Sequence, residues 1–200
     1  MKLCRHVEIA LPAWIEEFTA QWPAWQHGGL RTPEERMALA IALAAENVTR
    51  DTGGPFGAIV VREDNGELLG VGVNLVTQLQ MSTAHAEMVA LALAQQAVSS
   101  WNLGTTGTVQ LVTSCEPCAM CFGAVPWSGI GSIICGARKE DAESAGFDEG
   151  DKPPDWVESL RRRGISVQRD VLRKEAARVL QDYVAGDGTI YNPGRAPESG

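Results

Sequence analysis

From residue 56 onward, short apolar segments alternate with segments that have the pattern of helices. The first two, 56–61 and 68–73, are joined by a linker containing Asn65-Gly66, the dipeptide most typical of a tight β-hairpin. Further strands are predicted at 109–113, 132–135 and 165–168, and helices at 84–98, 118–126, 155–163 and 174–185. Strands separated by helices need crossover connections, which favour mostly parallel pairing after the antiparallel hairpin. The order predicts a three-layer α/β/α sandwich around a mixed five-stranded sheet.

Another helix is predicted before the hairpin, and its start is well marked. Thr32 can cap it, Pro33 fits the first helical position, and Glu35 completes a capping box. Apolar residues then recur at helical spacing over 36–48. By contrast, Gly and acidic residues are frequent in 137–154, which predicts a long loop.

The chain has 200 residues, the length of one ordinary domain. Residues 1–30 contain three tryptophans and are predicted to be a helical extension that packs on the domain or on a partner subunit. Residues 31–185 form the predicted domain, and residues 186–200 a tail. A free end is the default for such a Gly- and Pro-rich tail, although Tyr191 within it could close over a small substrate.

Charge and cysteine content limit the kinds of partner. Lys and Arg number 17 against 25 Asp and Glu, a net charge of -8, whereas nucleic-acid binders need clustered positive charge. No apolar run approaches the ~18 residues of a membrane-spanning helix, and acids and Pro12 interrupt the only N-terminal stretch that could resemble a signal peptide. Five cysteines, an odd number without a secreted disulfide pattern, favour a reducing compartment. We expect a cytoplasmic protein that binds neither nucleic acid nor a membrane.

Two short motifs carry the chemistry. His85-Ala86-Glu87 opens one predicted helix, and Pro117-Cys118-Ala119-Met120-Cys121 opens another. One imidazole and two thiolates are good zinc ligands, and three protein ligands leave a tetrahedral ion one position for water, whose pKa zinc lowers to about 7. His85, Cys118 and Cys121 are therefore the predicted ligands of Zn2+, and Glu87 is the predicted general acid/base.

The spacing of these motifs imposes a geometric condition. Residues i and i+2 do not share a helix face, so His85 and Glu87 converge only if the N-terminal end of their helix points at the metal. The same orientation would let backbone N–H groups stabilise the thiolates of Cys118 and Cys121. The sequence thus predicts two helix N-termini facing one zinc ion.

Other uses of these residues remain open at this point. A closed structural zinc site would need a fourth ligand from Cys115, Cys135 or His27. The C-x-x-C pair could instead be a redox pair, or part of an iron–sulfur run that begins at Cys115. Neither alternative explains why Glu87 lies two residues from the histidine, and this favours catalytic zinc.

The sequence H-A-E followed by P-C-x-x-C resembles the signature of the zinc-dependent cytidine and deoxycytidylate deaminase superfamily, whose members hydrolyse nucleobase amino groups. The resemblance covers roughly residues 33–185 and implies a cytidine deaminase-like fold. The helix between the fourth and fifth strands is similar to that of the tRNA adenosine and guanine deaminases. Three further stretches resemble the guanine deaminases: Gly53-Gly54-Pro55-Phe56-Gly57-Ala58, Thr113-Ser114-Cys115-Glu116-Pro117-Cys118 and Ala145-Gly146-Phe147-Asp148-Glu149.

The resemblance also implies a substrate site. Asn74 would hydrogen-bond the purine, Glu149 would contact the ring and relay a second proton, and Ala86 would offer its backbone N–H. Phe56 and Trp127 would hold the flat ring between them. Each residue has a plainer alternative, as a turn asparagine, a solvated loop acid, ordinary backbone or core aromatic packing.

The chemistry of guanine fits this site. Its N1–H and 2-amino group are both donors, so the Glu149 carboxylate is a suitable acceptor. The resemblance therefore implies hydrolysis of guanine to xanthine and ammonia, in purine salvage or catabolism, with a small purine base as the binding partner. It also implies a homodimer, since members of this type commonly dimerise.

Three alternatives are weighed against this interpretation. A tRNA adenosine deaminase is favoured by the basic runs Arg161-Arg162-Arg163 and Arg173-Lys174, and opposed by the net charge and by Phe147-Asp148-Glu149. The substrate could also be another amino-heterocycle, such as a pteridine or triazine. The alternative of a different class is a non-enzymatic zinc module.

Overall fold

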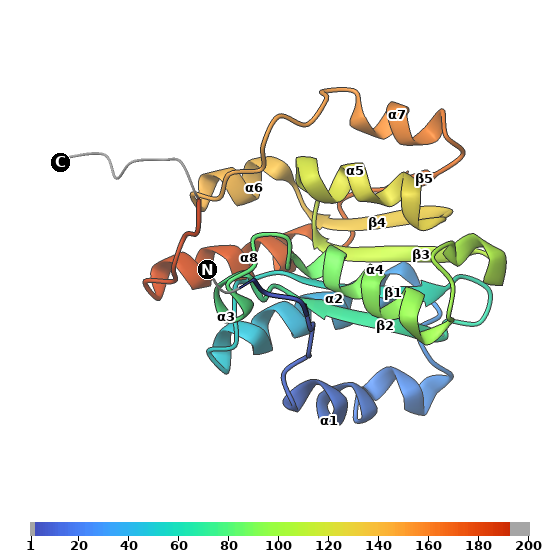
Figure 1. Cartoon of the computed structure of the whole chain (residues 1–200), viewed down its shortest axis with the longest axis horizontal. Coiled ribbons are helices and arrows are strands. Elements are labelled where there is room, and N and C mark those ends of the chain that lie inside the picture. The colour runs from blue at the N-terminus through green and yellow to red at the C-terminus, as the bar shows by residue number, and fades with distance from the viewer. Residues whose placement is uncertain (1–2, 193–200) are drawn as a thin grey trace.

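The computed structural model describes residues 3–192 and, within them, the backbone but not the side chain of His27. Its strands are β1 (Gly57–Arg62), β2 (Leu68–Val73), β3 (Val109–Cys115), β4 (Ser132–Ala137) and β5 (Ser166–Gln168). Its α-helices are α1 (Trp14–Ala20), α2 (Pro33–Thr49), α3 (Val76–Leu79), α4 (Ala86–Ala97), α5 (Ala119–Ser128), α6 (Lys139–Ser144), α7 (Trp156–Arg161) and α8 (Arg173–Ala185). Two 3₁₀ helices are η1 (Pro23–His27) and η2 (Leu103–Thr106). Figure 1 shows the helices arranged around one sheet.

The sheet has five strands in the order β2-β1-β3-β4-β5. β1 is antiparallel to both of its neighbours, whereas β3, β4 and β5 are parallel. Outside the hairpin, two of the three pairings are parallel, as expected, and the exception is β1 with β3, because β1 lies between β2 and β3. The crossover through α4 makes β2 and β3 run in the same direction, and β1 opposes both. The predicted mixed five-stranded sheet is confirmed.

Alternating residues of the central strands divide the core between the two faces of the sheet. Ile59 and Val61 pack in the cluster that contains the buried face of α2, while Ala58 and Val60 pack in the cluster that contains α4. α8 covers β4 on the same side as α2. These helix, sheet and helix layers are the predicted three-layer sandwich (Figure 1).

Local sequence explains where the two helices that matter most are placed. α2 begins with the predicted capping box, in which Thr32 Oγ1 accepts a hydrogen bond from the Glu35 N–H. α4 packs closely on β2 because Gly72 has no side chain. A Cβ atom at that position would lie 2.0 Å from the Ala86 carbonyl oxygen. The start of α4, which carries His85 and Glu87, is therefore fixed against the sheet.

Two segments differ from the expected loop and free end. The expected loop 137–154 contains α6. At the N-terminus of this helix, the Arg138 N–H donates a hydrogen bond to the Asp141 side chain, which stabilises the helix. Residues 186–192 do not project freely, because the Asn192 side chain bonds Gly146 and Asp148. The rest of the tail, residues 193–200, lies outside the described residues. The N-terminal segment packs on the core through Ile15 and Leu30, as predicted.

Across residues 3–192, every helix is too short or too polar to cross a membrane.

Candidate active site

Three side chains converge where two helices begin. His85 is the N-cap of α4, Cys118 is the N-cap of α5, and Cys121 lies in the first turn of α5. His85 Nδ1 is 3.5 Å from Cys118 Sγ and 3.7 Å from Cys121 Sγ. Two helix N-termini therefore face one point, as the spacing of the motifs predicts.

The spacing of these atoms fits zinc. Tetrahedral zinc with ordinary bond lengths places nitrogen and sulfur ligands about 3.6 Å apart. Within residues 3–192, the group of side chains close enough to share a metal consists of His85, Cys118 and Cys121. A hydrogen bond from Cys121, followed by one from His85, lowers the pKa of the Cys118 thiol to about 4. The donor set is thus that of a three-ligand zinc site.

The other candidates for a fourth ligand do not join this group. The Cys115 thiol faces the Arg138 carbonyl oxygen at 3.6 Å, and burial raises its pKa well above the usual range. Cys135 is fully buried in β4, and burial raises its pKa as well. The side chain of His27 lies outside the described part of the structure. Three ligands leave the fourth position of a tetrahedral ion for water.

Glu87 lies beside the ligands in the first turn of α4. One of its carboxylate oxygens is 3.5 Å from Cys121 Sγ, and the other accepts a hydrogen bond from the Thr113 hydroxyl at 3.2 Å. The side chain is 6% exposed, and burial, followed by the negative charge of Cys118, raises its pKa. A carboxyl group in this position can take up a proton near the metal and release it again.

A cavity of about 770 Å³ opens above this centre. Six residues predicted for the site line it: Phe56, Asn74, His85, Glu87, Cys118 and Glu149. Asn74 is buried after β2, and its side-chain oxygen accepts a hydrogen bond from the Val76 N–H at 3.3 Å. Phe56 meets Phe147 edge to face, with ring centroids 4.9 Å apart. Metal ligands and polar and aromatic groups thus share one cavity.

Glu149 also lines the cavity. It is 5% exposed, and its Oε2 atom is buried without a hydrogen-bond partner within the described residues. Burial is the main cause that raises its pKa to about 8, followed by the charges of Cys118 and Glu87. An unpartnered buried carboxylate oxygen is costly, so its presence in a cavity indicates a ligand that donates to it.

Ala86 and Trp127 are placed differently from each other. Ala86 is the first residue of α4, between two cavity-lining residues, where helix N–H groups have no intrahelical acceptor. Trp127 is 81% exposed and does not line the cavity in the described part of the chain, which corrects its predicted stacking role. The physical reason is that α5 starts at the metal site, and nine residues of helix carry Trp127 about 13 Å along it.

Two more aromatic residues belong to the cavity. Phe147 lies in the acidic run 145–149 and has no predicted role, whereas for Tyr191 closure over a substrate was the alternative to a free tail. Both line the cavity, with ring centroids 5.6 Å apart. The Tyr191 hydroxyl is also buried without a partner among residues 3–192. An aromatic residue in a polar tail was the available signal.

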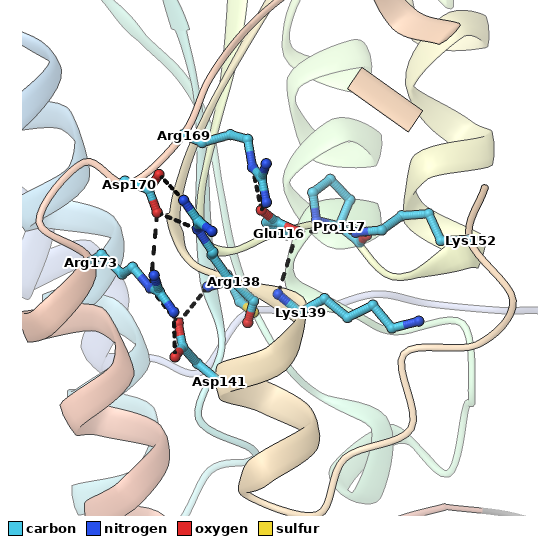
Figure 2. Close-up of polar contacts among 10 residues, drawn as sticks. Glu116, Pro117, Arg138, Lys139, Asp141, Lys152, Arg169, Asp170 and Arg173 are labelled. Atoms are coloured by element: carbon cyan, nitrogen blue, oxygen red, sulfur yellow. Dashed lines mark hydrogen bonds and ion pairs between the residues drawn. The ribbon is translucent and has the colours of Figure 1, made fainter. Parts of the chain in front are cut away.

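A cluster of ion pairs surrounds Glu116, next to Pro117 at the start of the cysteine motif (Figure 2). Glu116, 2% exposed, accepts hydrogen bonds from the Arg169 Nε atom at 2.6 Å and pairs with Lys152 at 3.5 Å. Asp141 and Asp170 pair with arginines nearby. We call Glu116, Arg138, Asp141, Lys152, Arg169, Asp170 and Arg173 the rear ion-pair cluster.

Together, the layered fold and the three-ligand centre with its adjacent carboxylate define a metal-dependent hydrolase. The family model of the cytidine and deoxycytidylate deaminase zinc-binding region matches residues 30–137. The chain belongs to this deaminase family, as its motifs predicted.

Three relatives illustrate the likeness. Guanine deaminase of Bacillus subtilis is 39% identical over 58% of this chain and 71% of the relative. A solved structure of guanine deaminase from Nitrosomonas europaea is 40% identical, covers 92% of this chain and 100% of that one, and has a TM-score of 0.84. A tRNA-specific adenosine deaminase of Buchnera aphidicola is 30% identical over 64% of this chain and 79% of the relative.

Proposed function

We propose that this chain hydrolyses guanine to xanthine and ammonia. The observation that carries the proposal is the buried, unpartnered Glu149 oxygen in the same cavity as Glu87 and two of the three metal ligands, His85 and Cys118. Guanine presents two adjacent hydrogen-bond donors, N1–H and the 2-amino group. This oxygen can accept hydrogen bonds from them. The similarity to two guanine deaminases, at 39% and 40% identity, supports the same substrate.

The metal centre and Glu87 would divide the work of hydrolysis. His85, Cys118 and Cys121 would hold the zinc ion, which when bound would supply an acidified water molecule. Glu87 accepts a proton from water and gives it to the departing amino group, so that ammonia leaves after C2 has gained oxygen. Its carboxylate lies 3.5 Å from Cys121 Sγ, directly beside the ligand group.

The rest of the cavity would orient the purine. Glu149 accepts from the guanine edge, and a carboxyl group whose pKa is about 8 can also relay a second proton near neutral pH. Asn74 and the backbone N–H of Ala86 would hydrogen-bond the ring. Phe56 would contact one ring face, and its edge-to-face partner Phe147 closes that side of the cavity.

An ammonia-release panel tests this function. We expect turnover with guanine to exceed that with adenine, cytosine, their nucleosides, pteridines and triazines. Stoichiometric inosine formation in tRNA without turnover of free guanine would show the adenosine deaminase alternative instead. Absence of ammonia release from all of these compounds, in protein with one zinc per chain, would support the non-enzymatic zinc module.

We further propose that the chain forms a homodimer in the cytoplasm. Trp101 and Trp127 are 77% and 81% exposed, and large exposed aromatic residues are typical of surfaces that a partner covers. All five cysteines are free, which agrees with a reducing compartment. Sedimentation equilibrium should give the mass of two chains, and Trp127→Ala should weaken the association. A single-chain mass at all concentrations would contradict the dimer.

A further inference from the structure

Lys152 is a buried lysine close to the candidate active site, three residues after Glu149. Its side chain is 2% exposed, and its Nζ atom donates to the Pro117 carbonyl oxygen at 2.8 Å. The same atom lies 3.5 Å from Glu116 Oε2 and 4.4 Å from the centre of the Trp156 ring. Figure 2 shows the lysine reaching toward Glu116 and Pro117. Because burying an ammonium group is costly, these partners fix where it can lie.

The loop that carries Glu149 is thereby attached on both sides of a metal ligand. Lys152 bonds to the carbonyl of Pro117, which precedes Cys118, and the Ala119 N–H, which follows Cys118, donates to the Glu149 carbonyl oxygen at 2.9 Å. Within the loop, the Lys152 N–H donates to the Gly150 carbonyl at 2.9 Å. The short turn 149–152 therefore has a defined position relative to Cys118.

Charge balance alone does not account for Lys152. Glu116 already has a cationic partner in Arg169, whose Nε and guanidinium NH2 nitrogens both approach the same carboxylate oxygen. What Lys152 adds is the bond to Pro117, and with it a connection between the turn and the metal-binding segment. Lys152 itself does not line the cavity in the described part of the chain.

We propose that Lys152 is a positioning residue, which holds the Glu149 carboxyl group in register with the metal centre through turn 149–152. The inference rests on the proposed function, because it assigns to Lys152 the placement of a group that contacts guanine. Small displacements of a positioned group cost up to about 100-fold in rate, so the effect should be measurable.

The test replaces Lys152 by methionine, which keeps an unbranched stem beside Trp156 but removes the charge and the donors. We expect kcat for guanine to fall about 10- to 100-fold, affinity for the guanine analogue 8-azaguanine to weaken, and zinc content to stay at one per chain. The matched control is Arg169→Met, which removes the other partner of Glu116. It should lower thermal stability while kcat stays within about threefold of the unmodified protein.

A double-mutant cycle separates positioning from a general structural effect. If Lys152 acts through Glu149, the double variant Lys152→Met/Glu149→Gln should have the kcat of Glu149→Gln alone. Losses that multiply, or an unchanged kcat in Lys152→Met, would overturn the proposal. Should the methionine variant not fold, the same cycle is run with Lys152→Arg, with the same criterion. If the unmodified protein releases no ammonia from guanine, the proposed function fails first, and that result is seen before any variant is made.

Discussion

Buried carboxyl groups near the metal ligands differ from the one in the rear ion-pair cluster. Glu87 and Glu149 are 6% and 5% exposed and have raised pKa values, with burial as the main cause. Glu116 also contributes to the cavity lining and is 2% exposed, yet Arg169 and Lys152 both pair with its carboxylate. Equal burial therefore has different consequences, depending on whether cations face the carboxylate.

This difference separates carboxyl groups that can take part in a reaction from carboxyl groups that stabilise the structure. A carboxyl group without a matched cation has a raised pKa, so it takes up a proton more readily and remains available to a ligand. A carboxylate between two cations accepts hydrogen bonds and fixes the segments that carry its partners. The rear ion-pair cluster thus stabilises the framework, and the cavity keeps its carboxyl groups for substrate.

The largest expected effect is on the cavity side, at Glu87. We expect Glu87→Gln to lower kcat with guanine by roughly 1,000-fold or more, because the amide cannot accept the proton. Zinc, measured by elemental analysis, should remain at about one per chain, since Glu87 is not a ligand. Undiminished ammonia release would contradict the catalytic role of Glu87.

The effect of Glu149→Gln should be smaller but of the same kind. The amide keeps the size of the side chain and one acceptor oxygen, yet it cannot relay a proton and it has lost the second carboxylate oxygen. We expect turnover of guanine to fall about 100-fold, with zinc content unchanged. Activity equal to that of the unmodified protein would reduce Glu149 to an ordinary loop acid.

The sequence was sufficient for the parts of the site set by local spacing. The H-A-E and P-C-x-x-C motifs identify residues held by single helix N-termini, so His85, Glu87, Cys118 and Cys121 could be found without tertiary information. The stacking role predicted for Trp127 was wrong, because the position of this residue depends on the direction in which α5 runs from the metal site. Residues brought in from distant segments, such as Tyr191 and Lys152, have no local pattern.

The same distinction holds for the fold. Hairpin and helix-start signals located the elements, with α6 missed in an acidic stretch. The antiparallel pairing of β1 with β3 arises because β1 lies between β2 and β3 in the sheet. This order is set by tertiary packing and has no local sequence signal.

A third experiment addresses the rear ion-pair cluster. Glu116→Gln should lower the free energy of unfolding by about 3 kcal/mol, because it leaves buried Lys152 and Arg169 without their shared anion. Urea unfolding measures this loss. The matched control is Asp182→Asn in an exposed pair with Arg178, whose side chains are 71% and 64% exposed, and it should cost less than about 0.5 kcal/mol. Equal effects at both positions would contradict a supporting role for burial in the rear ion-pair cluster.

The last comparison concerns how the free energy of unfolding depends on pH, which should have opposite signs for Asp141 and Glu149. Hydrogen bonds from Arg173 lower the pKa of Asp141 below its usual 3.8, so its stabilising contribution is present above that pH and is lost as the pH falls through the folded-state pKa. Asp141→Asn should therefore cost on the order of 0.5 kcal/mol at pH 7 and progressively less as the pH falls below 3.8, measured by urea unfolding.

On the cavity side, the sign is reversed. The pKa of Glu149 rises from 4.5 to about 8 on folding, so its favourable contribution is complete below pH 4.5 and is lost as the pH rises through 8. The stability of Glu149→Gln relative to the unmodified protein should accordingly increase between these pH values, while that of Asp141→Asn stays constant. Parallel pH profiles for the two variants would mean that both carboxyl groups have the same environment, and the contrast between the cavity and the rear ion-pair cluster would not hold.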